Sequence, residues 1–154
     1  MESGKATTTT SLIRVSDVMS NNVAVAGMLE PLSEAVTTML ERNVGCIVVT
    51  DWGTVVGIVT KGDVLRKAFL RGMEAREVSV KVTMTRPVVT IDPDSTIEEA
   101  AKLMITKGVS KLPVVKDRKL VGVITMTDII RAEPTQVGYL QELVRARFVP
   151  HDLS

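Results

Sequence analysis

The chain has 154 residues, 45% of them hydrophobic, which is enough to build one compact domain or two small ones that share a core. Nineteen basic and 18 acidic residues leave a net charge of +1, and aromatic residues make up only 3%, so the composition argues against nucleic acid as a partner. The single cysteine, Cys46, excludes an intrachain disulfide and a multi-cysteine zinc motif, and its apolar neighbours favour a small buried side chain.

The N-terminal residues 1–12 are rich in Thr and Ser and lack a hydrophobic stretch, so we expect a disordered tail rather than a signal peptide. No apolar run approaches the roughly 20 residues needed to cross a bilayer. One thiol and no export signal favour a cytoplasmic location, and we expect no membrane partner.

The first half of the chain predicts, in order, an extended segment, a helix, two strands joined by a tight turn, and a second helix. The first helix has apolar residues at helical spacing, which predicts one buried stripe, and Pro31 lies near its start and Asn43 at its end. The residues are Val23–Val25 (extended), Leu32, Ala35, Val36, Met39 and Leu40 (stripe), Val44–Thr50 and Thr54–Thr60 (strands), and a helix from Gly62.

The second half predicts the same order of elements. Ser95 and Glu98 fit a capping box at the start of its first helix, and Gly108 fits a left-handed residue at its end. The segments are Val88–Ile91 (extended), Ile97, Ala100, Ala101, Met104 and Ile105 (stripe), Val109–Val115 and Leu120–Thr125 (strands), and a helix from Thr127. After Pro134, a segment with helical periodicity packs, by our interpretation, on the module or on a second subunit.

The two halves are copies of each other. Shifting the chain by 65 residues aligns Val15–Arg66 with Val80–Arg131 without a gap and gives 13 identical pairs in 52 positions. We therefore predict an α/β (α+β) fold of two β-α-β-β-α repeats that bury their sheets against each other, because a copy of about 55 residues is marginal alone. The predicted parts are a tail (1–12), repeat 1 (13–72), repeat 2 (73–134) and a C-terminal helical tail (135–154).

Both copies carry the pattern Gly-hydrophobic-hydrophobic-Thr-x-x-Asp, at Gly57–Asp63 and Gly122–Asp128. A threonine that ends a strand and an aspartate that enters a helix suit a phosphate and the two vicinal hydroxyls of a ribose. The same residues often serve only as a helix N-cap, and recurrence does not decide between the two, since a repeated helix needs a repeated cap.

The repeated pattern resembles the CBS domain, which occurs as a tandem pair called a Bateman module. The resemblance rests on both Thr-x-x-Asp segments, on Val80–Met84 with Pro87–Ile91, and on Gly108–Val115, and it covers about Val15–Glu133. It implies two sheets packed around a pseudo-twofold axis and two clefts that bind adenosine derivatives such as AMP, ADP, ATP or S-adenosylmethionine.

The resemblance also implies which residues bind the ligand. Asp63 and Asp128 would hold ribose hydroxyls, Thr60 and Thr125 would lie near the phosphate, and main-chain groups would flank the adenine. Lys61, Lys111 or Arg131 could reach a phosphate, although a solvated surface charge is the more common role of each. The candidate ligand-binding residues are Thr60, Asp63, Thr125, Thr127, Asp128, Val23, Val25, Gly45, Cys46, Val88, Thr90, Ser110, Lys111 and Pro113.

The copies differ in ways that favour the second site. Repeat 2 has Ser110, Pro113 and Thr127 where repeat 1 has Gly45, Val48 and Gly62, so it offers additional hydroxyl groups and the proline common in the family. We expect the site built on Thr125, Thr127 and Asp128 to bind better.

We predict no enzymatic activity and no metal or cofactor. The lone histidine, His151, has no second His or Cys with which to pair, and Asp63 and Asp128 have no neighbouring base in the sequence. The predicted function is regulation by an adenine nucleotide, with a homodimer and an unidentified target protein as partners. The alternatives are an S-adenosylmethionine binder and a ligand-free interaction module, in which Met39 and Met104 form a partner surface instead of filling the core.

Overall fold

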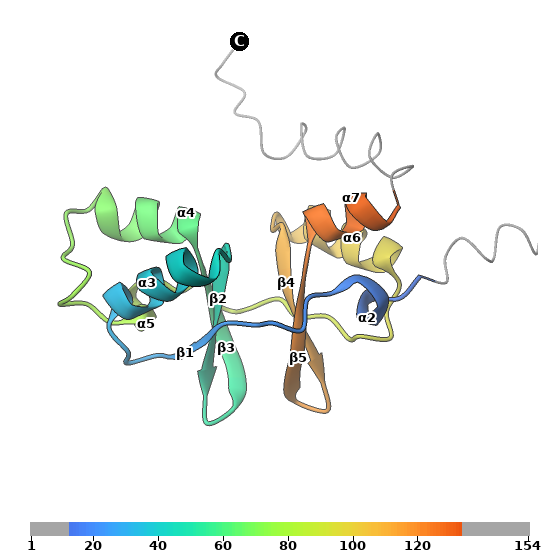
Figure 1. Cartoon of the computed structure of the whole chain (residues 1–154), viewed down its shortest axis with the longest axis horizontal. Helices are drawn as coiled ribbons and strands as arrows, with labels where there is room; N and C mark the ends of the chain where they lie inside the picture. The colour runs from blue at the N-terminus through green and yellow to red at the C-terminus, as the bar shows by residue number, and fades with distance from the viewer. Residues whose placement is uncertain (1–12, 134–154) are drawn as a thin grey trace, which may run out of the picture. The chain divides into compact units, whose positions relative to one another are not determined.

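The computed structural model describes residues 13–133, which form two compact units (Figure 1). We call Asn22–Val89 with Asp117–Leu120 the Thr60 unit, and residues 13–21, Thr90–Lys116 and 121–133 the Thr125 unit. The elements mix short helices and small sheets, which confirms the predicted α+β class. They are α2 (Val15–Val18), β1 (Val25–Gly27), α3 (Leu32–Arg42), β2 (Cys46–Asp51), β3 (Thr54–Thr60), α4 (Lys61–Asp63), the π-helical η1 (Val64–Phe69), α5 (Val80–Thr83), α6 (Ile97–Lys107), β4 (Lys111–Lys116), β5 (Lys119–Thr125) and α7 (Met126–Ala132).

The Thr60 unit is built on a three-stranded sheet of order β1-β2-β3. Strand β1 is parallel to β2, with α3 as the crossover, and β2 is antiparallel to β3. β-Branched and small side chains of the sheet pack with Ala35 and Met39 of α3 in one buried cluster. Because the apolar faces of sheet and helix cover each other, the end of β3 is held rigidly where α4 begins.

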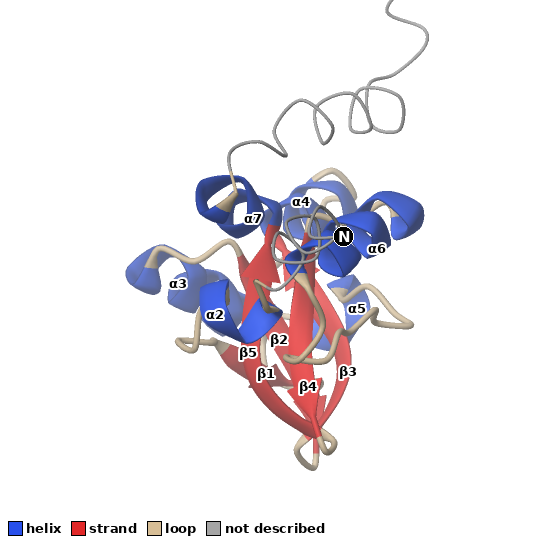
Figure 2. Ribbon diagram, turned by 90° about the vertical axis from the view of Figure 1, so that its right-hand side faces the viewer, coloured by secondary structure: helices blue, strands red, loops and turns tan. Residues whose placement is uncertain are grey.

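The Thr125 unit has a two-stranded sheet, β4-β5, with α6 and α7 packed together and α6 packed on β4. Its largest fully buried side chains include Met104, Leu112, Ile124 and Ile129. The two strands run side by side to their connecting turn, which lies at the end of the hairpin away from α7 (Figure 2). The burial of Met104, and of Met39 in the Thr60 unit, confirms that these methionines fill the core.

Both hairpins close with two residues that have positive φ, which confirms the predicted tight turns. Trp52 and Gly53 have φ of 52° and 83°, and Asp117 and Arg118 have φ of 50° and 68°. Two central residues with positive φ define the turn whose twist matches a right-handed strand pair. The second turn achieves this conformation without a glycine.

The predicted ends of the two long helices are confirmed, but one predicted start is wrong. Asn43 and Gly108 are left-handed C-caps, as expected. The capping box of α6 is formed by Thr96 and Glu99, one residue beyond the predicted Ser95 and Glu98. The shift arises because the Ser95 N–H donates to the Asp92 carbonyl in a preceding turn.

The predicted buried stripe of α3 is too wide. Leu32, Ala35 and Met39 are buried, but Leu40 is 71% exposed. The shorter second helices begin at Lys61 and Met126, one residue before the predicted Gly62 and Thr127, because the preceding threonines are their N-caps. No helix within residues 13–133 is both long enough and apolar enough to cross a membrane.

The segment that leads each sequence copy pairs with a strand of the other copy. Thr85 exchanges backbone hydrogen bonds with Ile58 on β3, and Ser20 exchanges them with Val123 on β5. A Cβ on Gly57 would lie 2.8 Å from Met84 Sδ, and one on Gly122 would lie 2.6 Å from Met19 Sδ. The repeated glycine is therefore explained by the close approach of the crossing segment, which brings Thr85 next to the end of β3.

Candidate functional site

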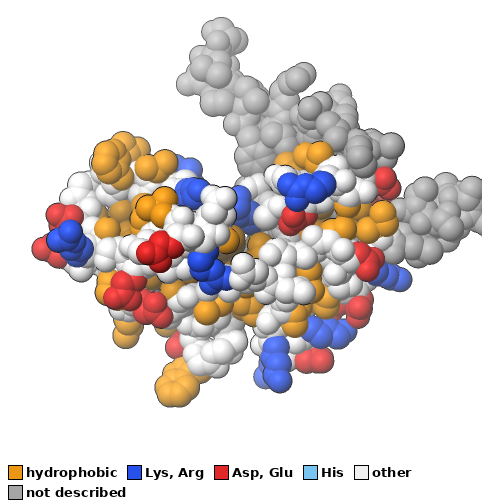
Figure 3. All heavy atoms as spheres, viewed as in Figure 1, with side chains coloured by type: hydrophobic (Ala, Val, Ile, Leu, Met, Phe, Trp, Pro, Cys, Tyr) orange, Lys and Arg blue, Asp and Glu red, His pale blue; other side chains and the backbone are white. Residues whose placement is uncertain are grey.

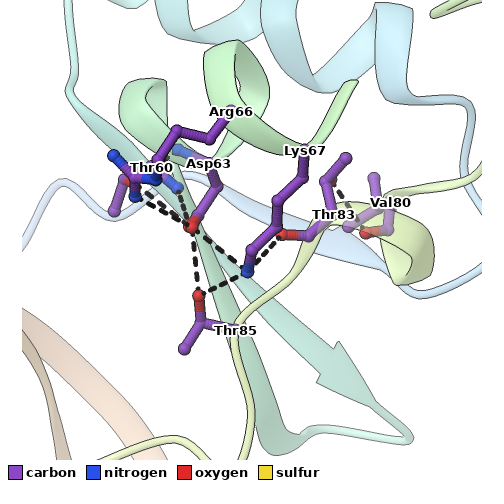
Figure 4. Close-up of polar contacts among 7 residues, drawn as sticks. All are labelled: Thr60, Asp63, Arg66, Lys67, Val80, Thr83 and Thr85. Atoms are coloured by element: carbon purple, nitrogen blue, oxygen red, sulfur yellow. Dashed lines mark hydrogen bonds and ion pairs between the residues drawn. The ribbon is translucent and has the colours of Figure 1, made fainter. Parts of the chain in front are cut away.

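The threonine and aspartate of the first motif form a capping box at the junction of β3 and α4 (Figure 4). The Thr60 N–H and hydroxyl donate to Asp63 Oδ2 at 2.9 and 3.1 Å, and the Asp63 N–H donates to Thr60 Oγ1 at 3.1 Å. The N-cap interpretation of the motif is therefore confirmed for Thr60. The cap uses one carboxylate oxygen, Oδ2, which leaves Oδ1 available to other donors.

In the Thr60 unit, Asp63 Oδ1 already has donors from two other elements. The Thr85 hydroxyl donates to it at 3.1 Å, and Lys67 Nζ lies 3.3 Å from it. The Lys67 ammonium also donates to Thr85 Oγ1 at 3.0 Å and to the Thr83 carbonyl at 3.3 Å. Arg66 lies further from the carboxylate, at 3.6 Å. Only 5% of the Asp63 side chain is exposed, so this charge is buried and paired.

The second motif repeats the capping box and has different surroundings. The Thr125 N–H donates to Asp128 Oδ2 at 2.8 Å, and the Asp128 N–H donates to Thr125 Oγ1 at 3.1 Å. Asp128 Oδ1 lies 3.9 Å from an Arg131 guanidinium nitrogen, a long contact made by a side chain that is mostly exposed. The Asp128 side chain is 18% exposed, so its second oxygen is more accessible than that of Asp63.

Several of the other predicted ligand residues lie beside these two motifs. Beside the first motif, the Lys61 N–H donates to the Gly45 carbonyl. In the same sheet, Cys46 pairs with Thr60. Beside the second motif, the Met126 N–H donates to the Ser110 carbonyl. Thr127 is exposed at the start of α7, Lys111 is half-buried and Pro113 is buried in β4.

Other predicted residues lie away from the motif of their own unit or are not tied to it by a contact. Val25 is exposed on β1 and lines an open hollow with Leu29 and Trp52. Val88 lines a separate hollow with Val55 and Arg86. Val23 is half-buried before β1, and Thr90 is exposed before Ile91, whose N–H donates to the Pro113 carbonyl. Cys46 is buried, as expected. His151 lies outside the described residues.

Two residues of the first site were missed by the sequence analysis. The spacing of four between Asp63 and Lys67 is a recognisable helical ion-pair signal, so Lys67 could have been included. Thr85 could not have been included, because its approach depends on the crossing of the leading segment. Within the described part of the chain, no group of three or more His, Cys, Asp or Glu side chains is placed to hold a metal ion.

The CBS domain matches the chain twice, at residues 15–69 and 75–134. The chain therefore belongs to the CBS domain family, and the predicted tandem pair is confirmed.

The chain is similar to proteins from archaea and bacteria. It is 34% identical over 132 residues to the uncharacterized protein MK0525 of Methanopyrus kandleri, a match that covers 84% of this chain and 67% of that protein. It is 33% identical over 129 residues to YlbB of Bacillus subtilis, covering 80% and 84%. The chain spans only 50% and 31% of two curated relatives from Methanocaldococcus jannaschii, MJ1225 and MJ1404.

Solved structures of CBS-domain proteins share the fold. The CBS domain pair of protein MJ0100, in complex with 5′-methylthioadenosine and S-adenosyl-L-methionine, matches with a TM-score of 0.70 and 30% identity, covering 77% of this chain and 98% of that one. A CBS domain protein of Thermoplasma acidophilum matches with a TM-score of 0.78 at 23% identity, covering 88% and 78%, which supports the fold alone.

Proposed function

We propose that the chain is a regulatory module that binds an adenosine-containing compound at the Thr125–Asp128 motif. The observation that carries the proposal is that the two oxygens of the Asp128 carboxylate have different partners. Asp128 Oδ2 accepts the cap hydrogen bond, and within residues 13–133 Oδ1 makes a long contact with the exposed Arg131. A carboxylate oxygen with spare lone pairs accepts hydrogen bonds from vicinal ribose hydroxyls, so the capping role and the ligand role are compatible.

Adenosine is the common part of the ligands we consider. The similar CBS pair of MJ0100 was solved with 5′-methylthioadenosine and S-adenosyl-L-methionine, both of which carry a ribose and an adenine. AMP, ADP and ATP carry the same two groups, and Arg131 and the exposed Thr127 hydroxyl could bind their phosphates. A ligand that binds one conformation of the module more tightly than another would shift the population toward the first conformation. A separate target protein would then respond to that conformation.

The direct test is thermal unfolding of the full chain with AMP, ADP, ATP, S-adenosylmethionine, 5′-methylthioadenosine or GMP. A ligand at 100 times its Kd should add about 2.7 kcal/mol of stability, which is a visible rise in Tm. A rise with adenosine compounds and none with GMP supports the proposal. No rise with any compound at millimolar concentration favours the alternative, a ligand-free interaction module.

The ribose contact is tested with Asp128→Asn and a deoxy ligand. Removing the charge should weaken binding of the best ligand roughly tenfold or more, since a charge-assisted hydrogen bond is lost. The 2′-deoxy form of that ligand should bind the wild type more weakly, and Asp128→Asn should show a smaller loss with it. Equal losses in both proteins would mean that Asp128 does not contact the ribose. Chromatography of the recovered ligand tests the non-enzymatic prediction, for which we expect unchanged nucleotide.

We also propose that the chain forms a homodimer through the helices of the Thr60 unit. Leu40, Leu65, Phe69 and Leu70 are all more than half exposed, and apolar side chains gather on the surface over α4 and η1 (Figure 3). An open groove of about 250 Å³ runs between α3 and this segment. Exposed apolar patches mark association surfaces. Light scattering should give twice the chain mass, and Leu65→Glu should give a monomer. A monomeric wild type at working concentration would contradict this assembly.

A further inference from the structure

We infer that Lys67 closes the Thr60 site, so that the Thr125 site is the single tight adenosine site of each chain. The inference rests on the proposed function and adds the residue that decides which of the two motifs binds. It follows from the contacts around Asp63, where a side chain of the protein occupies the carboxylate oxygen that a ribose would need.

The Lys67 ammonium has three N–H donors and three acceptors within reach. They are Asp63 Oδ1 at 3.3 Å, Thr85 Oγ1 at 3.0 Å and the Thr83 carbonyl at 3.3 Å. The acceptors come from α4, from α5 and from the segment that follows α5, so the lysine links three parts of the unit. Lys67 is 31% exposed and its partner carboxylate only 5%, so water competes weakly for this contact.

A ribose would have to displace strong interactions to reach Asp63. Its hydroxyls are neutral donors, whereas Lys67 is a cation, so the lysine adds the attraction of two opposite charges to its contact with the buried carboxylate. The displaced ammonium would also lose its contacts with Thr83 and Thr85. Asp63 Oδ2 offers no alternative, because it already accepts from both the N–H and the hydroxyl of Thr60.

The Thr125 unit lacks this lysine. The residue equivalent to Lys67 is Ala132, the last residue of α7, whose side chain cannot donate. The arginines of the two motifs do not account for the difference, because Arg66 and Arg131 are equivalent and make similarly long contacts of 3.6 and 3.9 Å. The exchange of lysine for alanine therefore leaves the second carboxylate without this cation.

The test is a reciprocal exchange measured by isothermal titration calorimetry on the full chain, with 5′-methylthioadenosine and AMP as the ligands. We expect one tight site per chain in the wild type and two in Lys67→Met. Ala132→Lys should weaken the tight site at least tenfold, while Ala132→Met, which adds similar length without charge, should weaken it by less than threefold. If Lys67→Met does not fold, the comparison of Ala132→Lys with Ala132→Met carries the test alone.

Each result separates this inference from the proposed function. Three outcomes overturn the inference and leave the proposed function in place. They are two equal sites in the wild type, a single site in folded Lys67→Met, and an affinity of Ala132→Lys equal to that of the wild type. Binding that appears only in Lys67→Met supports closure by the lysine and overturns the Thr125 site. No binding in any variant overturns both.

Discussion

The two Thr-x-x-Asp motifs share their capping geometry and differ in the groups that face the second carboxylate oxygen. In both, the threonine N–H donates to one aspartate oxygen, and the aspartate N–H donates back to the threonine hydroxyl. The second oxygen of Asp63 faces Lys67 and Thr85, whereas that of Asp128 has a long contact with Arg131. The motif therefore determines the start of a helix, and residues outside it determine what the carboxylate is able to bind.

The glycine of the motif provides a second comparison, and we expect it to give the largest difference in stability. A Cβ on Gly122 would lie 2.8 Å from the Ser20 carbonyl oxygen, whereas one on Gly57 would lie 3.2 Å from the Thr85 carbonyl oxygen. Backbone yields less readily than the flexible methionine that also faces each glycine. Gly122→Ala should therefore cost about 3 kcal/mol and Gly57→Ala about 1 kcal/mol, within the range of overpacked sites. Urea unfolding followed by circular dichroism measures both, and equal costs would contradict this account.

For the aspartates we expect the larger loss of stability in the first motif, the reverse of the order expected for the glycines. Asp63→Asn leaves the Lys67 ammonium without its buried counter-ion, and we expect a loss of about 2 kcal/mol, moderated by the partial exposure of the lysine. Asp128→Asn disturbs mainly the cap and should cost about 1 kcal/mol or less. The urea midpoints of the two variants give the comparison, and Lys67→Met combined with Asp63→Asn is the control. If the ion pair is the cause, the double variant should lose less than the sum of the two single variants.

Most of the fold could be predicted from the sequence because its signals are local. The hairpins, the C-caps at Asn43 and Gly108 and the threonine caps each depend on residues within a few positions of one another. The errors arose where tertiary contacts decide. Leu40 fits the helical period of the buried stripe but is exposed beside the open groove that it lines with Leu65. The Ser95 N–H is used by a turn, and the capping box is formed by Thr96.

The candidate site could be predicted only in part for a related reason. Thr60, Asp63, Thr125 and Asp128 follow from the repeated pattern. The partners that make the two sites unequal do not, because Thr85 reaches Asp63 only through the crossing of a segment that the sequence places in the other copy. An alignment of the copies pairs Thr85 with Ser20 and Lys67 with Ala132, but only the contacts show that Thr85 and Lys67 both reach the Asp63 carboxylate.

The hairpin turns offer a smaller test of the comparison between the copies. Gly53 and Arg118 occupy the second central position of their turns, with φ of 83° and 68°. A left-handed conformation costs a non-glycine residue roughly 1 kcal/mol. Arg118→Gly should therefore stabilise the protein by about 0.5 kcal/mol, after allowance for the greater freedom of glycine in the unfolded chain. Gly53→Ala should destabilise it, and its new methyl group meets no atom, so the effect isolates the backbone. Differential scanning calorimetry of both variants should give Tm shifts of opposite sign.

The smallest expected effect concerns an ion cluster present only in the Thr125 unit. Lys116 Nζ donates to Asp94 Oδ2 at 2.8 Å, whereas the equivalent residues of the other copy are Asp51 and Leu29. The hydrogen bond and the charge of Lys116 hold the pKa of Asp94 below its ordinary value of 3.8. A carboxyl with a lowered folded pKa adds stability above its unfolded pKa, and this stability is lost as the pH falls through the folded value. Asp94→Asn should therefore be slightly less stable than the wild type at pH 7 and equal to it near pH 2.

Because both side chains are largely exposed, 1 M salt should remove most of the difference at pH 7. Urea midpoints at the two pH values, with and without salt, measure it, and a difference that persists at pH 2 would assign the effect of the substitution to the turn around Asp94 instead of the charge.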